Sequence, residues 1–102
     1  MLVTTGVYQS QSSAENGYKL YNNFPNPFNP QTSISYYLPS GENVKLKVFD
    51  ILGNEITTLV NEFKSSGIHS VIFDAKDIPS GVYFYGIQAG KYSDRKKMMV
   101  IK

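Results

Sequence analysis

Side chains that could carry out acid–base or nucleophilic chemistry are few in this sequence. The only histidine, His69, alternates with Val71 and Phe73 at strand spacing, which favours a hydrogen-bonded histidine at the margin of a core over a catalytic base. Cysteine is absent, so thiolate nucleophiles, disulfides and thiolate metal sites are excluded. No serine stands in a pattern that supplies it with a base and an orienting acid. We therefore expect a protein that is not an enzyme and has no cofactor.

Two carboxylates, Asp74 and Asp77, fall in the stretch DAKDIPSG and could contribute ligands to a calcium site. Two acids in a turn with proline and glycine are more often turn caps than calcium ligands. The glycines Gly81, Gly86 and Gly90 do not follow the strand-to-helix pattern of a phosphate-binding loop. The sequence therefore predicts no metal site and no phosphate site.

The composition is that of one globular domain. The chain has 102 residues, 41% of them hydrophobic and 14% aromatic, with a formal net charge of +2, which is too small to indicate nucleic-acid binding. It shows neither a signal peptide nor an apolar run of about 20 residues, the length of a membrane-spanning helix. Residues 1–17 are rich in Gln, Ser, Asn and Gly, which is typical of a linker from a preceding domain. We expect the folded domain to span residues 18–102 and the chain to be a piece of a longer protein.

Apolar and polar residues alternate with a period of two, as in Ile34, Tyr36 and Leu38, which indicates strands with one buried and one solvated face. Turn residues separate the alternating stretches. The expected strands lie at about residues 18–21, 32–38, 43–49, 55–61, 68–74, 82–89 and 92–101. About seven short antiparallel strands predict an all-β, immunoglobulin-like sandwich, with a small barrel as the alternative.

Three positions fit structural roles in such a sandwich. Asp50 and Gly53 suit a tight hairpin turn, in which aspartate caps the turn and glycine adopts a positive φ. Tyr83 follows Gly81 near the start of the penultimate strand, where a tyrosine often donates to upstream backbone and forms a tyrosine corner. We expect the Tyr83 hydroxyl to serve stability rather than chemistry.

The stretch FPNPFNP begins at Phe24 and contains Pro25, Asn26, Pro27 and Phe28. Prolines lack an N–H and push the preceding residue towards extended backbone. We expect an extended segment that lies on the domain through the anchors Phe24 and Phe28 without pairing to a strand.

The C-terminal stretch places Arg95, Lys96 and Lys97 directly before the apolar run MMVI and the final Lys102. On residue physics alone, charges beside a last strand solvate it and protect an edge. The run is apolar on both faces, so it could be buried on both.

The motifs PNPFNPxTxIxYxLP, VxLxVFDxLGxEI, IPSGVYFYGIQAG and RKKMMVIK occur in this order. Together they resemble the type A C-terminal sorting domain of the type IX secretion system of Bacteroidetes and related bacteria, over about residues 18–102. One departure is Phe73-Asp74-Ala75, where many relatives have Trp-Asp-Gly. The flagellar hook-capping immunoglobulin-like domain shares the sandwich and part of the GVY pattern, but it lacks the PNPFNP opening joined to a terminal lysine motif.

The resemblance implies an immunoglobulin-like domain that directs an N-terminal passenger across the outer membrane and is commonly removed as the passenger reaches the cell surface or is released. It implies an outer-membrane translocon, a shuttle protein and a sortase-like protease as partners, and transit through the periplasm. It places recognition on Lys97, Met98, Val100 and Lys102. Nucleic acid is not an expected partner, and the domain is not expected to span a membrane.

Two other functions fit the residues. A non-catalytic carbohydrate-binding or adhesion module would use outward aromatic rings such as Tyr37, Phe49 and Phe84, which could stack on sugars or contact a protein. An inert spacer domain is the third reading. Position separates them, because a sorting signal must end the polypeptide, as Lys102 does here, whereas a sugar-binding module could stand anywhere.

Overall fold

The computed structural model describes residues 17–102, so nearly all of the predicted linker, residues 1–17, lies outside the described residues. The described part folds into seven strands. They are β1 (Lys19–Leu20), β2 (Gln31–Leu38), β3 (Glu42–Phe49), β4 (Glu55–Lys64), β5 (Gly67–Asp74), β6 (Gly81–Ala89) and β7 (Tyr92–Val100). Within residues 17–102 there is no helix with the length and apolar character needed to cross a membrane.

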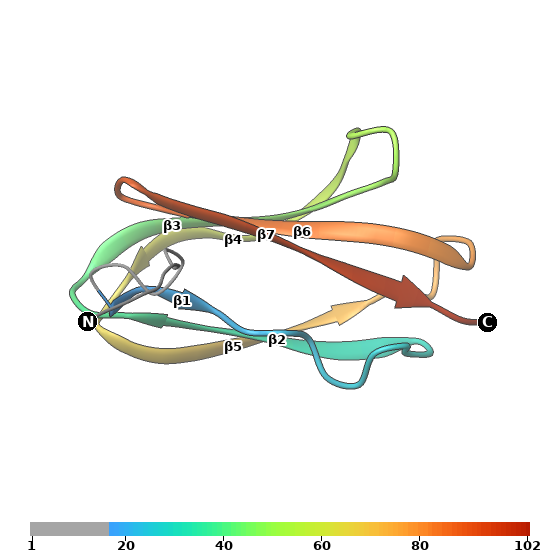
Figure 1. Cartoon of the computed structure of the whole chain (residues 1–102), viewed down its shortest axis with the longest axis horizontal. Helices are drawn as coiled ribbons and strands as arrows, with labels where there is room; N and C mark the ends of the chain where they lie inside the picture. The colour runs from blue at the N-terminus through green and yellow to red at the C-terminus, as the bar shows by residue number, and fades with distance from the viewer. Residues whose placement is uncertain (1–16) are drawn as a thin grey trace, which may run out of the picture.

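The strands form two antiparallel sheets that face each other (Figure 1). One sheet has the order β1-β2-β5 and the other the order β4-β3-β6-β7. Relative to a constant-type immunoglobulin domain, the fourth strand has moved from the first sheet to the edge of the second. The prediction of an all-β immunoglobulin-like sandwich of about seven strands is confirmed.

The period-two pattern places alternate side chains of both sheets in a shared core. On β2 the buried apolar side chains are Ile34, Tyr36 and Leu38, and on β3 they include Leu46. The other buried apolar residues are Leu20, Phe28, Val44, Val48, Val60, Phe73, Ala75, Tyr83, Tyr85, Ile87, Ala89, Met98 and Val100. Burying a large apolar side chain contributes about 1.5–3 kcal/mol, so this core is the main source of stability.

Strand β4 continues to Lys64 rather than ending near Asn61 as predicted. The register of the β3–β4 pair shifts between Leu46 and Lys47 and again between Val48 and Phe49. Such bulges bend a strand and increase its twist. The β3–β4 hairpin accordingly rises away from the other sheet at its turn (Figure 1).

His69 lies at the core margin, as its strand spacing predicted. Its ring stacks on Tyr36 with centroids 5.4 Å apart, and its Nε2 lies 2.7 Å from the Ser65 carbonyl oxygen. Both contacts explain the residue as part of the packing around β5.

Candidate functional site

Two segments that stand at opposite ends of the domain sequence meet at one end of the sandwich (Figure 1). We call residues 24–30 the Pro-rich segment and residues 97–102 the terminal segment. A parallel bridge pairs Phe28 of the first with Val100 of the second. The candidate site is this junction.

Backbone hydrogen bonds and one side chain hold the junction together. The Phe28 N–H donates to the Met99 carbonyl at 3.1 Å, and the Ile101 N–H donates to the Phe28 carbonyl at 3.0 Å. The Asn26 Oδ1 accepts from the Met99 N–H at 3.0 Å. The Pro-rich segment therefore covers the outer edge of β7 over residues 99–101.

The expectation that the Pro-rich segment would not pair is wrong. Its prolines flank Phe28, which keeps its own N–H and carbonyl for the terminal segment. Phe24 also exchanges two backbone hydrogen bonds with Ser33 of β2. Its side chain is 79% exposed, so Phe24 is not an anchor, whereas Phe28 is.

The Phe28 ring explains why the segment lies on the core. It is 2% exposed and meets the Phe73 ring edge-on, with centroids 6.1 Å apart. A polar pair supports the segment from β2, because the Thr32 hydroxyl donates to the Pro25 carbonyl at 2.8 Å and the Asn23 amide donates to the Thr32 hydroxyl oxygen at 2.9 Å. Both sides of the segment are thus fixed.

The terminal segment presents alternate residues to the core and to solvent. Met98 and Val100 are each 1% exposed, so in the folded domain their side chains pack rather than meet a partner. Lys97 and Lys102 are exposed, as is Met99. A partner that binds the folded domain at this end would therefore contact the exposed residues Lys97, Met99 and Lys102.

Lys102 is fixed at both its backbone and its side chain. Its N–H donates to the Ser80 hydroxyl at 2.9 Å, and its ammonium donates to the Lys76 carbonyl at 3.0 Å. These contacts tie the terminal segment to the turn that precedes β6. The Lys102 ammonium therefore has a defined position at the site.

Asp74 belongs to the same turn and acts as its cap. It accepts from the Gln31 side-chain amide at 3.2 Å and from the Lys76 N–H at 2.9 Å. These hydrogen bonds, the one from Gln31 foremost, lower the pKa of the Asp74 carboxyl. Among residues 17–102, no three His, Cys, Asp or Glu side chains gather where they could hold a metal ion.

The surface at the junction is shallowly hollowed. A depression of about 210 Å³ is lined by Asn26, Pro27, Lys97, Met98 and Met99. Its lining combines the Lys97 cation, apolar atoms of Pro27 and the methionines, and the Met99 backbone, which is already hydrogen-bonded. This arrangement suits contact with a protein surface and offers no group for acid–base chemistry.

The remaining motif residues stabilise the framework. The Tyr83 hydroxyl donates to the Pro79 carbonyl at 2.8 Å, which is the upstream backbone contact that a tyrosine corner requires. Gly81 begins β6 and pairs with Val100. Gly53 has a φ of 90° in the β3–β4 turn, a conformation that L side chains disfavour.

Sequence reasoning missed the contribution of Met99, which pairs with the Pro-rich segment through both its N–H and its carbonyl. The sequence signal was the period of two in this strand: when Met98 and Val100 face the core, Met99 between them faces outward. No sequence pattern linked it to Asn26, because their contact joins residues 73 positions apart.

A family model for the secretion system C-terminal sorting domain matches residues 22–102. No curated protein matches the chain, and neither does any solved structure. The matched stretch includes both segments of the junction and all of the long strands. The chain therefore belongs to the family of type IX secretion system C-terminal sorting domains.

Proposed function

We propose that this domain is a non-catalytic signal that the export machinery reads in its folded form. Its family supports a C-terminal sorting signal for type IX secretion, so the protein that carries it is exported through that system. The finer steps are proposals: an outer-membrane translocon and a shuttle protein bind the domain, and a sortase-like protease removes it as the N-terminal passenger reaches the cell surface or is released.

The observation that carries this proposal is the junction of the two motif segments. A terminal strand that served only packing would need Met98 and Val100, which are buried. It would not need cations at Lys97 and Lys102, one exposed beside a hollow and the other held on backbone of a turn. We assign direct recognition to these two lysines, and to the Pro-rich segment the role of holding their strand in place.

Export of a fused passenger tests the proposal. Residues 1–102 are joined to a fluorescent protein behind an ordinary signal peptide, in a bacterium with type IX secretion, and fluorescence is followed in periplasm and medium. The intact fusion should reach the cell surface or medium. The Lys97→Ala, Lys102→Ala double variant should accumulate in the periplasm, because both recognition charges are lost.

A matched control separates recognition from folding. Lys19→Ala with Lys91→Ala also removes two exposed charges and should export normally. Each pair should change stability by no more than about 0.5 kcal/mol, as surface substitutions generally do, which thermal unfolding of the purified domains checks. If the intact fusion stays periplasmic while the purified domain binds a polysaccharide, the sorting proposal fails and an adhesion module replaces it.

A further inference from the structure

The four-stranded sheet has a solvent-facing side that the junction meets at Lys97 and Met99. On β3, β6 and β7 the residues that alternate with the core face outward, and we call this side the outer face. Its cross-strand rows place Lys47 beside Gly86 and Gly86 beside Arg95. The next rows align Phe49, Phe84 and Lys97, and then Lys45 with Gln88.

Gly86 makes a hollow in the middle of the outer face. The hollow measures about 390 Å³, and Lys45, Lys47, Phe49 and Arg95 are among its lining residues. The Arg95 guanidinium lies 5.0 Å from the centre of the Phe49 ring, a cation–π distance. A Cβ added at Gly86 would lie 3.6 Å from the Phe49 ring, so the missing side chain is what keeps the hollow open.

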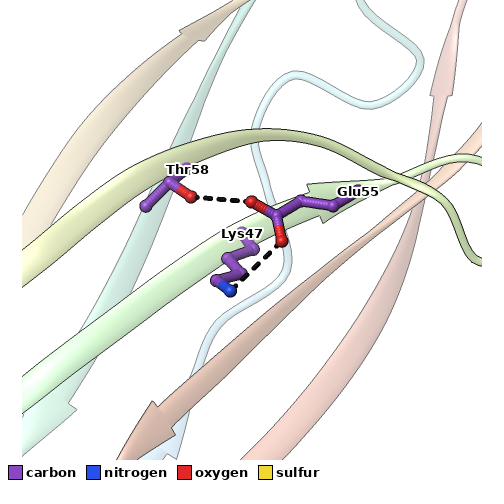
Figure 2. A network of polar contacts seen from close by, with 3 residues as sticks. All are labelled: Lys47, Glu55 and Thr58. Atoms are coloured by element: carbon purple, nitrogen blue, oxygen red, sulfur yellow. Dashed lines mark hydrogen bonds and ion pairs between the residues drawn. The ribbon is translucent and has the colours of Figure 1, made fainter.

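Positive charge on the outer face is only partly compensated. Within residues 17–102 the ion pairs are Lys47 with Glu55, at 3.2 Å, and Lys64 with Glu62. Figure 2 shows that Glu55 also accepts from the Thr58 hydroxyl, so each of its carboxylate oxygens has a partner. Lys45, Arg95 and Lys97 are in neither ion pair. Asp94 also lines the hollow, and its carboxylate accepts from the Arg95 N–H and the Tyr92 hydroxyl. Three cations, Lys45, Lys47 and Arg95, line the hollow beside this one acid, so the face remains attractive to carboxylates.

An apolar tip stands next to this charged hollow. The β3–β4 turn rises above the four-stranded sheet (Figure 1) and exposes 71% of Ile51 and 82% of Leu52. The Asp50 carboxylate accepts from the Leu52 and Asn54 N–H groups, each at 2.9 Å. These hydrogen bonds hold the backbone of the tip while its two apolar side chains stay mostly exposed, and a preorganised apolar pair lowers the entropic cost of binding.

We propose that the outer face and the Ile51–Leu52 tip form a docking surface for an acidic, partly apolar segment of a protein of the export machinery. Carboxylates of that segment would sit on Lys45 and Arg95 across the Gly86 hollow, and an apolar side chain would pack on the tip. This inference rests on the proposed function and adds a second contact surface, centred on Gly86 and adjoining the junction at Lys97.

The charges around the tip favour a protein segment over a lipid or an anionic polysaccharide surface. Asp50 and Glu55 flank the two apolar residues, and hydrogen bonds from Asn54 and Lys47, respectively, are the main causes that lower the pKa of each carboxyl. Both groups stay ionised at neutral pH, so insertion of the tip into hydrocarbon would be opposed. A uniformly anionic polymer would also place negative charge against the tip, where these two carboxylates repel it. A peptide can place acids over the hollow and an apolar side chain at the tip.

Photo-crosslinking in exporting cells tests the docking surface. A benzophenone amino acid replaces Gln88, which is exposed on the outer face, or Ile72, which is 56% exposed on the other sheet, in the fluorescent fusion. Adducts are identified by mass spectrometry. We expect the Gln88 probe, and not the Ile72 probe, to label a protein of the type IX machinery through a segment rich in Asp and Glu.

Substitutions decide whether that adduct reports the proposed contacts. Three variants should each reduce the adduct by about fivefold or more, because complementary charge and buried anchors dominate such interfaces. They are the double variant Lys45→Gln, Arg95→Gln and the single variants Gly86→Val and Leu52→Ser. The matched controls are the double variant Lys19→Gln, Lys91→Gln and the single variant Ile68→Ser. Both should leave the amount of adduct unchanged. Thermal unfolding confirms that each purified variant is folded.

The outcomes separate this inference from the sorting function. An adduct with lipid or polysaccharide, or an adduct that the three changes leave intact, overturns the docking surface. Normal export without any Gln88 adduct overturns it too, and leaves the sorting function standing. If the unmodified fusion is not exported, the sorting function itself fails, and the docking surface fails with it.

Discussion

At the residue scale, buried tyrosines join the parts of this domain through their hydroxyl groups. The Tyr85 hydroxyl, on the four-stranded sheet, donates to the Tyr21 carbonyl just after β1 at 2.7 Å. Burial raises the pKa of Tyr85 to about 12. The hydroxyl therefore stays protonated and remains a donor between the two sheets throughout the neutral range.

Tyr83→Phe should destabilise the domain by about 1 kcal/mol or somewhat more, because the Pro79 carbonyl loses its donor in a part-buried place. The midpoint of urea unfolding measures the change. Tyr37→Phe is the control, since Tyr37 is only half-buried, and it should move the midpoint much less. Equal midpoints for Tyr83→Phe and the unmodified domain would show that the corner hydrogen bond contributes nothing.

The β3–β4 turn should loosen in acid through Asp50. Hydrogen bonding, that of the Asn54 backbone foremost, lowers the pKa of its carboxyl. A lowered folded-state pKa stabilises the fold above the unfolded value of about 4, and this contribution is lost as pH falls through the folded-state pKa. NMR titration of the Leu52 and Asn54 amides should show the transition below pH 4. Asp50→Asn should abolish it, and an unchanged titration in that variant would assign it to another group.

At the element scale, the Pro-rich segment serves as a short partner for the end of β7. Without it, the last strand would present unpaired backbone at an edge of the sheet, where added strands promote aggregation. Asn26 and Phe28 occupy that edge at Met99 and Ile101. The proline spacing leaves Phe28 free to pair with the terminal segment and Phe24 free to pair with Ser33 of β2, and the prolines themselves have no N–H with which to extend the sheet.

Asn26→Ala should expose the Met99 amide without unfolding the domain. The Met99 N–H loses its acceptor, the Asn26 side chain, so hydrogen exchange of the Met99 amide should become faster. Exchange of the Ile101 amide, which donates to the Phe28 carbonyl, should change less. Phe28→Ala removes a buried ring and should cost about 3–5 kcal/mol, with faster exchange at both amides. Unchanged exchange at Met99 in Asn26→Ala would contradict the side-chain contact.

At the scale of the whole molecule, one apolar core between two sheets supplies the stability. The core draws side chains from every strand, and the tyrosine hydroxyls tie the sheets at its margin. A single core with contributions from all elements predicts one cooperative unfolding transition.

Unfolding of the domain should be cooperative and independent of calcium. The Asp74 carboxylate oxygens already accept hydrogen bonds from the Gln31 amide and the Lys76 N–H, so they are not arranged as a preformed ligand set for calcium. Calorimetry of purified domain in EDTA and in millimolar calcium should give the same Tm. A Tm raised strongly by calcium would reveal a site and contradict this expectation.

The sequence by itself determined the strand pattern and most of the core. Alternation identified Ile34, Tyr36 and Leu38 as inward residues, because a period of two is a local property of extended backbone. Turn chemistry at Asp50 and Gly53, and the Tyr83 corner, were also predictable, since each contact spans four residues or fewer. The ordered motifs further indicated the family.

Only the tertiary structure decided which parts of those motifs act together. It buried Met98 and Val100, left Lys97 and Met99 outside, and brought Asn26 against Met99. It also exposed Phe24 while burying Phe28, although both are phenylalanines of the same Pro-rich segment. These outcomes depend on how two sheets pack and on contacts between residues some 70 positions apart. Local backbone preference carries no information about such contacts, so no reading of the sequence alone could assign them.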